Sequence, residues 1–251
     1  STNITEPTLT RSLVHVTRVG YRLNHELSDD WELNHEFLAS FQETPEETFV
    51  GGNGILQLLG QNSITGVRRL LLSNPSERES YIFNTNFIGE FDVFGIDQTL
   101  LVGSEVSLET ETDILTLRGE LRPEGFSLFD PVYSTDGFDY ALPIEEQTPN
   151  NISVSNRNRY SFYGQTQFDF FAGNLIALLG GRVDIVDQDF VDARNVANPD
   201  PFEVNETAFS PRFGLVYKPS DNISLYTSYS QSFNPVIGQS RVGEVFGSEQ
   251  G

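Results

Sequence analysis

The side chains in this chain that are best able to do chemistry are three histidines and a set of arginines and aromatics. His15, His25 and His35 stand ten residues apart, and imidazole is a common metal ligand. No carboxylates converge with them on one strand face, so we expect packed or interfacial histidines and no metal site. The serines accompany no nucleophile elbow, and the absence of cysteine removes thiolate chemistry. We therefore expect no enzyme and no resident cofactor.

The arginines and aromatics of interest fall in polar connecting segments. Their guanidinium groups could hold a bulky anionic ligand or pair with the phosphates of lipopolysaccharide. Their rings could stack on the same ligand or simply pack within a loop. The candidate ligand-contacting residues are Arg68, Arg69, Phe129, Tyr133 and Tyr140. The sequence leaves both roles open.

The elements that must position these residues are strands, because eight segments alternate apolar and polar side chains with a period of two. In 31–42, Trp31, Leu33 and Phe37 share one face, and Glu32 and Asn34 lie on the other. The segments pair into four hairpins, formed by 16–27 with 31–42, 81–94 with 98–108, 160–170 with 175–184, and 209–217 with 223–230. In each segment one face is fit for lipid.

The connections between these segments alternate between very short and very long. Short turns are predicted at Ser28-Asp29-Asp30, Gly95-Ile96-Asp97, Ala172-Gly173-Asn174 and Pro219-Ser220-Asp221-Asn222. Long polar loops are predicted at 43–79, 109–156 and 187–206. Compact soluble domains rarely keep such loops, whereas transmembrane β-barrels have short periplasmic turns and long extracellular loops. The pattern therefore favours an all-β, antiparallel transmembrane β-barrel.

Composition agrees with this fold class and excludes others. The chain of 251 residues carries 36 acidic and 15 basic side chains, a net charge of −21, which argues against a nucleic-acid partner. No run of 18 apolar residues occurs, so we expect no membrane-spanning helix. An amphipathic sheet could also form half of a soluble sandwich. Aromatic residues near strand ends, such as Trp31 and Phe170, favour the barrel instead.

The orientation of the strands suggests that the chain is part of a larger barrel. With short turns on the periplasmic side, the first strand must run from outside to inside, and the chain also ends on the outside. A complete bacterial barrel is expected to start and end on the periplasmic side. We therefore expect residues 1–251 to be about eight consecutive strands of a larger barrel, without the remaining strands.

Several runs resemble the barrel of TonB-dependent outer-membrane receptors, in the ferric-siderophore branch. The most specific is "SPRFGLVYKPSDNISLYTSYSQSF" at 210–233. "YGQTQFDFFAGNLIALLGGRVD" at 163–184 and "FDVFGIDQTLLVGSEV" at 91–106 resemble two further hairpins of that family. "FDPVY" at 129–133 resembles an external-loop motif of the same branch. Together these runs follow the order of the family over most of 81–238.

The resemblance implies a barrel of 22 strands in the outer membrane and a monomeric receptor that imports ferric siderophores. It implies as partners the siderophore, membrane lipid, lipopolysaccharide and a TonB complex. The plug domain and the TonB box through which that complex acts are absent from 1–251. A passive porin-like barrel and a soluble glycan-binding β module remain as alternatives. Arg182, Asp184 and Arg212 lie on polar strand faces, where we expect structural roles, including an ion pair of Arg182 with Asp184.

Overall fold

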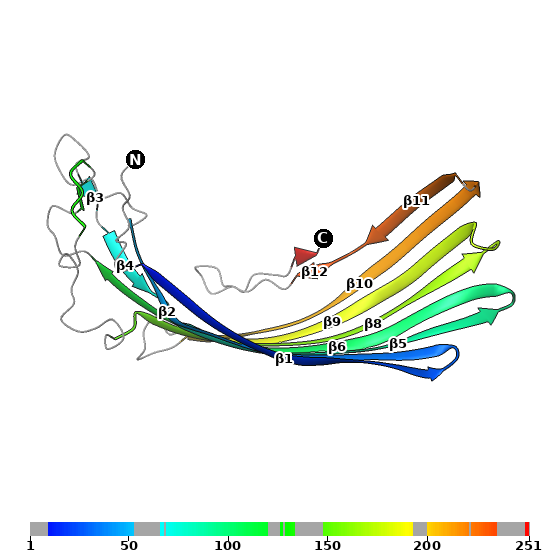
Figure 1. The fold of residues 1–251 in the computed structure, drawn as a ribbon, viewed down its shortest axis with the longest axis horizontal. Helices are drawn as coiled ribbons and strands as arrows, with labels where there is room; N and C mark the ends of the chain where they lie inside the picture. Colours follow the sequence, from blue (N-terminus) through cyan, green and yellow to red (C-terminus); the bar gives the residue numbers. More distant parts are fainter. Residues whose placement is uncertain are drawn as a thin grey trace.

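The chain folds as one curved antiparallel β-sheet (Figure 1). The computed structural model describes residues 10–52, 66–67, 69–119, 126–127, 129–133, 148–192, 200–220, 222–234 and 249–250. These residues form strands and turns, and no helix among them is long and apolar enough to cross a membrane.

Nine strands make up the main sheet. They are β1 (Arg11–Ser28), β2 (Trp31–Gly52), β4 (Arg69–Ser73), β5 (Ser76–Val93), β6 (Ile96–Gly119), β8 (Asn151–Phe170), β9 (Leu175–Asp192), β10 (Asp200–Ser220) and β11 (Ile223–Ser230). Two small sheets pair β3 (Gly66–Val67) with β7 (Phe126–Ser127), and β12 (Phe233–Asn234) with β13 (Glu249–Gln250). The order of the main sheet follows the chain, as expected for a meander.

The four predicted hairpins are confirmed. β1 pairs with β2, β5 with β6, β8 with β9, and β10 with β11, all antiparallel. The short β4 occupies the same place between β2 and β6 as β5 does, because β2 and β6 pair with β5 along most of their length and with β4 near their far ends. With β4 and β5 sharing one position, the sheet has eight strand positions across its width, in agreement with the eight alternating segments.

The register of the sheet aligns the apolar residues into rows. Tyr21, Phe37, Phe83, Val106 and Tyr160 follow one another across five neighbouring strands. Their rings are in contact, with centroids 5.8 Å apart for Tyr21 and Phe37 and 4.8 Å for Phe37 and Phe83. Because the period of a strand is two, this register places the aromatic rows on one face and most polar rows on the other, where Leu38, Ile82 and Leu101 are exceptions.

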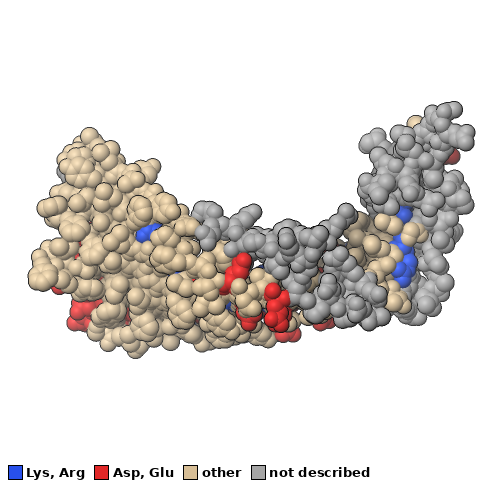
Figure 2. Space-filling model, turned by 180° about the vertical axis from the view of Figure 1, so that it is seen from behind, with Lys and Arg blue, Asp and Glu red and all other residues tan. Residues whose placement is uncertain are grey.

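The apolar face is not covered by protein. Tyr21, Phe162 and Phe209 are 55%, 58% and 60% exposed. Figure 2 shows only scattered charged side chains over the part of the sheet that carries the short turns. A continuous apolar surface of this extent is far larger than a soluble monomer tolerates. The sheet is therefore built to lie against an apolar solvent, with its hydrophobic side chains facing outward.

The strands extend well into the three predicted long loops, and this part of the prediction was wrong. β2 continues to Gly52, β6 to Gly119 and β9 to Asp192, whereas β8 begins at Asn151 and β10 at Asp200. In these extensions apolar residues such as Val50, Leu117 and Val186 are interspersed with charged ones, so the regular alternation that marks a strand is lost. The backbone nevertheless pairs in register with its neighbours, and this pairing holds the strands together.

The short turns lie close to their predicted places. The first comprises Asp29 and Asp30, and the third runs from Phe171 to Asn174. The second is shifted from its predicted place, because Phe94 and Gly95 form the turn and Ile96 already begins β6. Similarly, Pro219 lies in the last residues of β10 rather than in the fourth turn; Asp221 lies outside the described residues.

Candidate functional site

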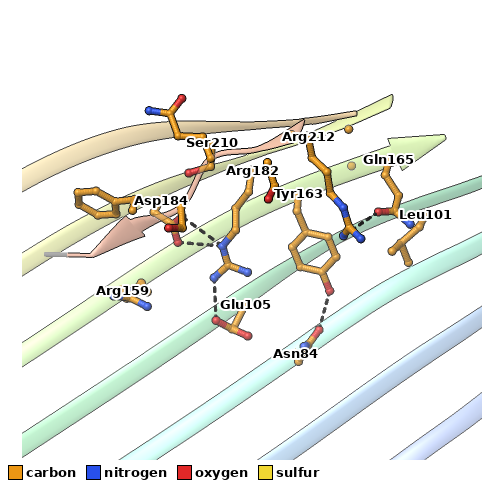
Figure 3. A pocket seen from close by; sticks show the side chains of 17 residues that line it. Asn84, Leu101, Glu105, Arg159, Tyr163, Gln165, Arg182, Asp184, Ser210 and Arg212 are labelled. Atoms are coloured by element: carbon orange, nitrogen blue, oxygen red, sulfur yellow. Dashed lines mark hydrogen bonds and ion pairs between the residues drawn. The ribbon is translucent and has the colours of Figure 1, made fainter. Parts of the chain in front are cut away.

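The polar face of the sheet contains an ion cluster centred on Arg182 of β9 (Figure 3). Arg182 Nη2 donates to Glu105 Oε1 of β6 at 2.8 Å, and Nε donates to the two oxygens of Asp184 at 3.0 and 3.2 Å. Ser161 of β8 donates its hydroxyl to Asp184 Oδ1 at 2.6 Å and accepts from Arg182 Nη2 at 2.7 Å. The predicted pair of Arg182 with Asp184 is confirmed, and the cluster links three strands.

A glycine determines where the neighbouring aromatic ring lies. Gly103 is the register partner of Tyr163, and a Cβ atom at Gly103 would lie 2.6 Å from the ring of Tyr163. The ring occupies this space, donates from its hydroxyl to Asn84 Oδ1 at 2.8 Å, and lies 5.8 Å from the Arg182 guanidinium carbon. The glycine thus lets the ring lie flat beside the ion cluster.

The cluster forms part of the wall of a hollow of about 630 Å³ on this face. The wall is formed by β5, β6, β8, β9 and β10 together with Ser230 to Phe233, which lead from β11 into β12. Figure 1 shows β12 over the concave side of the sheet, so the polar face is the concave one. Two further arginines, Arg159 and Arg212, also line the hollow.

Other polar rows on this face are paired in the same way. Arg22 and Glu36 form an ion pair at 3.0 Å, and Arg157 and Glu109 form one at 3.3 Å. Asn34 donates to Asn86 at 3.3 Å within a ladder of amides that also includes Asn24. These cross-strand pairs neutralise charges on the polar face. The pairing could not be predicted from the sequence, because partners such as Glu105 and Arg182 are 77 residues apart.

Among the histidines, His35 lies on the apolar face and is hydrogen-bonded. Its ring nitrogens lie 2.8 Å from Thr85 Oγ1 and 3.1 Å from Tyr21 Oη. Residues 10–52 and the other described ranges contain no group of three metal-ligating side chains. His35 thus packs between Tyr21 and Thr85 within the sheet.

The five predicted ligand-contacting residues are placed differently from one another. Arg68 and Tyr140 lie outside the described residues. Arg69 lies in β4 with its side chain fully buried, whereas Phe129 is 81% exposed and Tyr133 is 42% exposed. Of the candidates that the structure describes, the two aromatic residues are thus directly accessible to a ligand.

The structure brings together two of the segments that carry these candidates. β3, just before Arg68, pairs with β7, just before Phe129. The Ser127 hydroxyl then accepts from the backbone N–H groups of Phe129 at 3.3 Å and Asp130 at 3.0 Å. This turn fixes the backbone that presents the exposed Phe129 ring.

Beyond the apolar rows, charged residues pair across the strand extensions. Arg78 of β5 binds Glu111 of β6, and this hydrogen bond raises the pKa of Arg78 above its ordinary value. Burial raises the pKa of the nearby Asp113 carboxyl, with a further contribution from the negative charge of Glu111. Ion pairs such as Arg78 with Glu111 thus hold the extensions together, while neighbouring carboxylates such as Glu111 and Asp113 repel each other.

Comparison with known proteins identifies this sheet. A family model described as "TonB dependent receptor-like, beta-barrel" matches residues 2–249. The ferrichrome outer membrane transporter/phage receptor of Escherichia coli (strain K12) is 21% identical over 93% of this chain and 32% of its own length. The ferric-pyoverdine M114 receptor PbuA of Pseudomonas sp. (strain M114) is 22% identical over 85% of this chain and 26% of its own length.

A solved structure has the same fold. The ferripyoverdine receptor of the outer membrane of Pseudomonas aeruginosa, bound to ferripyoverdine, superposes with a TM-score of 0.71 at 18% identity, over 94% of this chain and 29% of that one. The chain thus spans about a third or less of the length of these relatives. The outward apolar rows, the polar concave face and the family match over nearly the whole sequence agree: the chain belongs to the TonB-dependent receptor family, as part of an outer-membrane β-barrel.

Proposed function

We propose that the protein carrying this chain imports a ferric siderophore across the outer membrane by TonB-coupled active transport, and that this chain forms part of its barrel wall. The observation that carries the proposal is the family match over residues 2–249. Relatives named for ferrichrome and ferric-pyoverdine support it. In this proposal the chain takes part in transport and catalyses no reaction.

The polar concave face suits this role. Its charges are paired across strands, as in the cluster of Arg182, Glu105 and Asp184, so the wall is hydrated without a large field of one sign. The ligand enters from the side of the strand extensions, opposite the short turns. There, exposed rings such as Phe129 and Tyr133 can stack on a bulky chelate. Arg68 can add positive charge, whereas Arg69, whose side chain is buried in β4, contributes only through its charge.

The test is iron uptake by cells that lack their own siderophore receptors and express the full-length protein. Radioactive iron is supplied as a panel of ferric siderophores, with and without TonB and with and without an uncoupler of the proton gradient. We expect accumulation of at least one chelate that is lost in both controls. Uptake that survives the loss of TonB would instead indicate a passive porin-like barrel.

The ligand contacts are tested in the same cells. Alanine at both Phe129 and Tyr133 should reduce uptake of the transported chelate about tenfold or more, because each stacking contact contributes about 1 kcal/mol. Alanine at Arg68, Arg69 and Tyr140 completes the proposed set. Phe94→Ala is the matched control, since this aromatic residue is 98% exposed at the opposite end of the sheet. Unchanged uptake with all five residues replaced would discard the set.

A further inference from the structure

The third short turn, which joins β8 to β9, has a strained backbone. Phe171 and Ala172 have φ angles of 55° and 54°, and Gly173 follows at 82°, so three successive residues take the left-handed conformation. Glycine adopts this conformation freely, but a residue with a Cβ atom is strained there. Two strained residues in one short turn indicate a conformation that is kept for a functional reason.

Backbone hydrogen bonds fix this turn. The N–H of Asn174 donates to the Phe171 carbonyl at 3.3 Å, and the N–H of Lys218 on β10 donates to the Asn174 carbonyl at 2.8 Å. The second bond ties the turn to the neighbouring hairpin, which Figure 1 shows beside it at the end of the sheet. The position of Phe171 is therefore set by the sheet.

The turn places the Phe171 ring against the outward face. The ring centroid of Phe171 lies 6.4 Å from that of Phe170, which lies 6.1 Å from that of Phe168. Phe168 and Phe170 belong to the outward rows of β8, and a straight strand would send the residue after Phe170 to the concave side. Phe94 in the second turn has a similar φ of 57°, but its ring is 98% exposed. Among the short turns of the described residues, the third thus returns an aromatic ring to the outward face.

The Phe171 ring lies at the edge of the lipid-facing band. The outward apolar rows of β8 run from Tyr160 to Phe170, which are ten residues apart, or about 33 Å of strand. At a strand tilt of about 35–45° this length spans about 25 Å of membrane, the height of the apolar band in outer-membrane barrels. The Phe171 ring, 76% exposed, therefore continues the lipid-facing surface just past its boundary.

The opposite face of the same strand ends is acidic. Asp92, Asp97 and Asp169 are in register on three neighbouring strands. Asp169 stands between Phe168 and Phe170 and so points to the concave side. A protein that docked on the strand ends from the water would bury these carboxylates together with the ring, which is costly. Lipid that already covers the outward rows can cover the ring alone, so the charge distribution favours lipid as the occupant.

We propose that the third turn is a lipid anchor. The Phe171 ring lies among the phospholipids of the leaflet on the short-turn side, at the boundary between head groups and acyl chains, where interfacial segments bury their apolar side chains. The left-handed turn and the Phe170 ring hold it there, and this contact fixes the height of the β8–β9 hairpin in the membrane. The first turn, with Asp29 and Asp30, offers no such contact. The inference rests on the outer-membrane location of the barrel and is independent of what the receptor transports.

The test measures the surroundings of the ring in the purified full-length receptor, reconstituted in a phospholipid bilayer. Para-fluorophenylalanine replaces one phenylalanine at a time, which keeps the ring and the fold. Fluorine NMR then measures relaxation by a nitroxide on the upper acyl chain and by a water-soluble gadolinium chelate. Phe213, outward on β10 and 49% exposed, is the lipid reference, and Phe129, 81% exposed, is the water reference.

We expect Phe171 to behave like the lipid reference. Because interfacial side chains lie about 5–10 Å deep in the boundary region, the nitroxide should relax Phe171 about threefold more than Phe129, and the gadolinium chelate about threefold less. Relaxation of Phe171 equal to that of Phe129 would overturn the proposal. The ring would then lie in water, as a docking site for a periplasmic protein requires.

Two alanine variants test what holds the ring in place. Phe170→Ala removes the ring against which Phe171 lies and should raise the gadolinium effect at Phe171 about twofold. Phe87→Ala is the matched control, because it removes an outward ring whose row crosses β8 at Gly164, six residues before Phe170. It should leave Phe171 unchanged. Equal effects of the two variants would contradict the proposed support by Phe170.

Discussion

Replacement of Gly103 by alanine tests whether the backbone of β6 makes room for the ring beside the ion cluster. The new Cβ atom would lie 2.6 Å from Cζ and 2.7 Å from Oη of Tyr163, and 2.8 Å from Cβ of Asn86. Favourable carbon contacts need about 3.5 Å or more. The ring must therefore move by about 1 Å, because the neighbouring strands fix the backbone on both sides.

The cost of this movement can be worked out from the contacts that are lost. Overpacking costs about 1–3 kcal/mol, the hydrogen bond from Tyr163 to Asn84 contributes about 1 kcal/mol, and the stacking of Arg182 on the ring about 0.5–1 kcal/mol. In the opposite direction, alanine stabilises a strand by about 0.5–1 kcal/mol relative to glycine, because it loses less conformational entropy on folding. We expect Gly103→Ala to lower the free energy of unfolding by about 2–4 kcal/mol.

The assay is denaturant unfolding of the full-length receptor in detergent, followed by circular dichroism. Gly119→Ala is the matched control, since no atom lies within 4 Å of the Cβ position there, and its effect should be within about 1 kcal/mol of zero. In a Tyr163→Ala background, Gly103→Ala should cost about 2 kcal/mol less than in wild type. The reasoning is refuted if Gly103→Ala is as mild as the control or if its cost is the same in both backgrounds.

Four further substitutions test the charges and turns by the same unfolding assay. Arg182→Met should cost about 3 kcal/mol, since it leaves Glu105 beside an Asp184 side chain that is only 7% exposed, and Glu105→Gln should cost clearly less. The raised pKa of the Asp113 carboxyl means that the folded state binds this proton more tightly than the unfolded state does. The contribution of Asp113 to the free energy of unfolding therefore falls as the pH rises above the ordinary pKa of 3.8. Asp113→Asn should then be more stable than wild type at neutral pH, with the difference closing as the pH falls towards 3.8; a constant difference would contradict this cause. Phe94 has a φ of 57° ahead of Gly95 at 80°, so Phe94→Asn should stabilise the turn by about 1 kcal/mol, and a loss of stability would contradict this reasoning.

The identity of the faces was determined by the sequence. A period of two in 31–42 and its partners assigns Trp31, Leu33 and Phe37 to one face whatever the register, because successive side chains of a strand must point to opposite sides. The short turns brought the hairpin partners together, and these local features were sufficient to predict the four hairpins. The fold class and the pair of Arg182 with Asp184, two residues apart on one strand, were therefore predictable.

The extent of the strands was not predictable. In the extensions of β2, β6, β8 and β9, apolar residues are mixed irregularly with charged ones, so no regular pattern in the sequence distinguishes a paired strand from a loop. Pairing there depends on hydrogen bonds to neighbouring strands that are already in register, which is a property of the assembled sheet.

The site itself was decided by the tertiary structure. Glu105 reaches Arg182 across 77 residues, and Gly103, Tyr163 and Asn84 meet only because β5, β6 and β8 lie side by side in one register. A slip of two residues would keep every side chain on its face and yet separate all these partners. The sequence alone determined which side chains face the concave side; the register of the folded sheet determined which of them meet, because cross-strand contacts depend on alignment and not only on alternation.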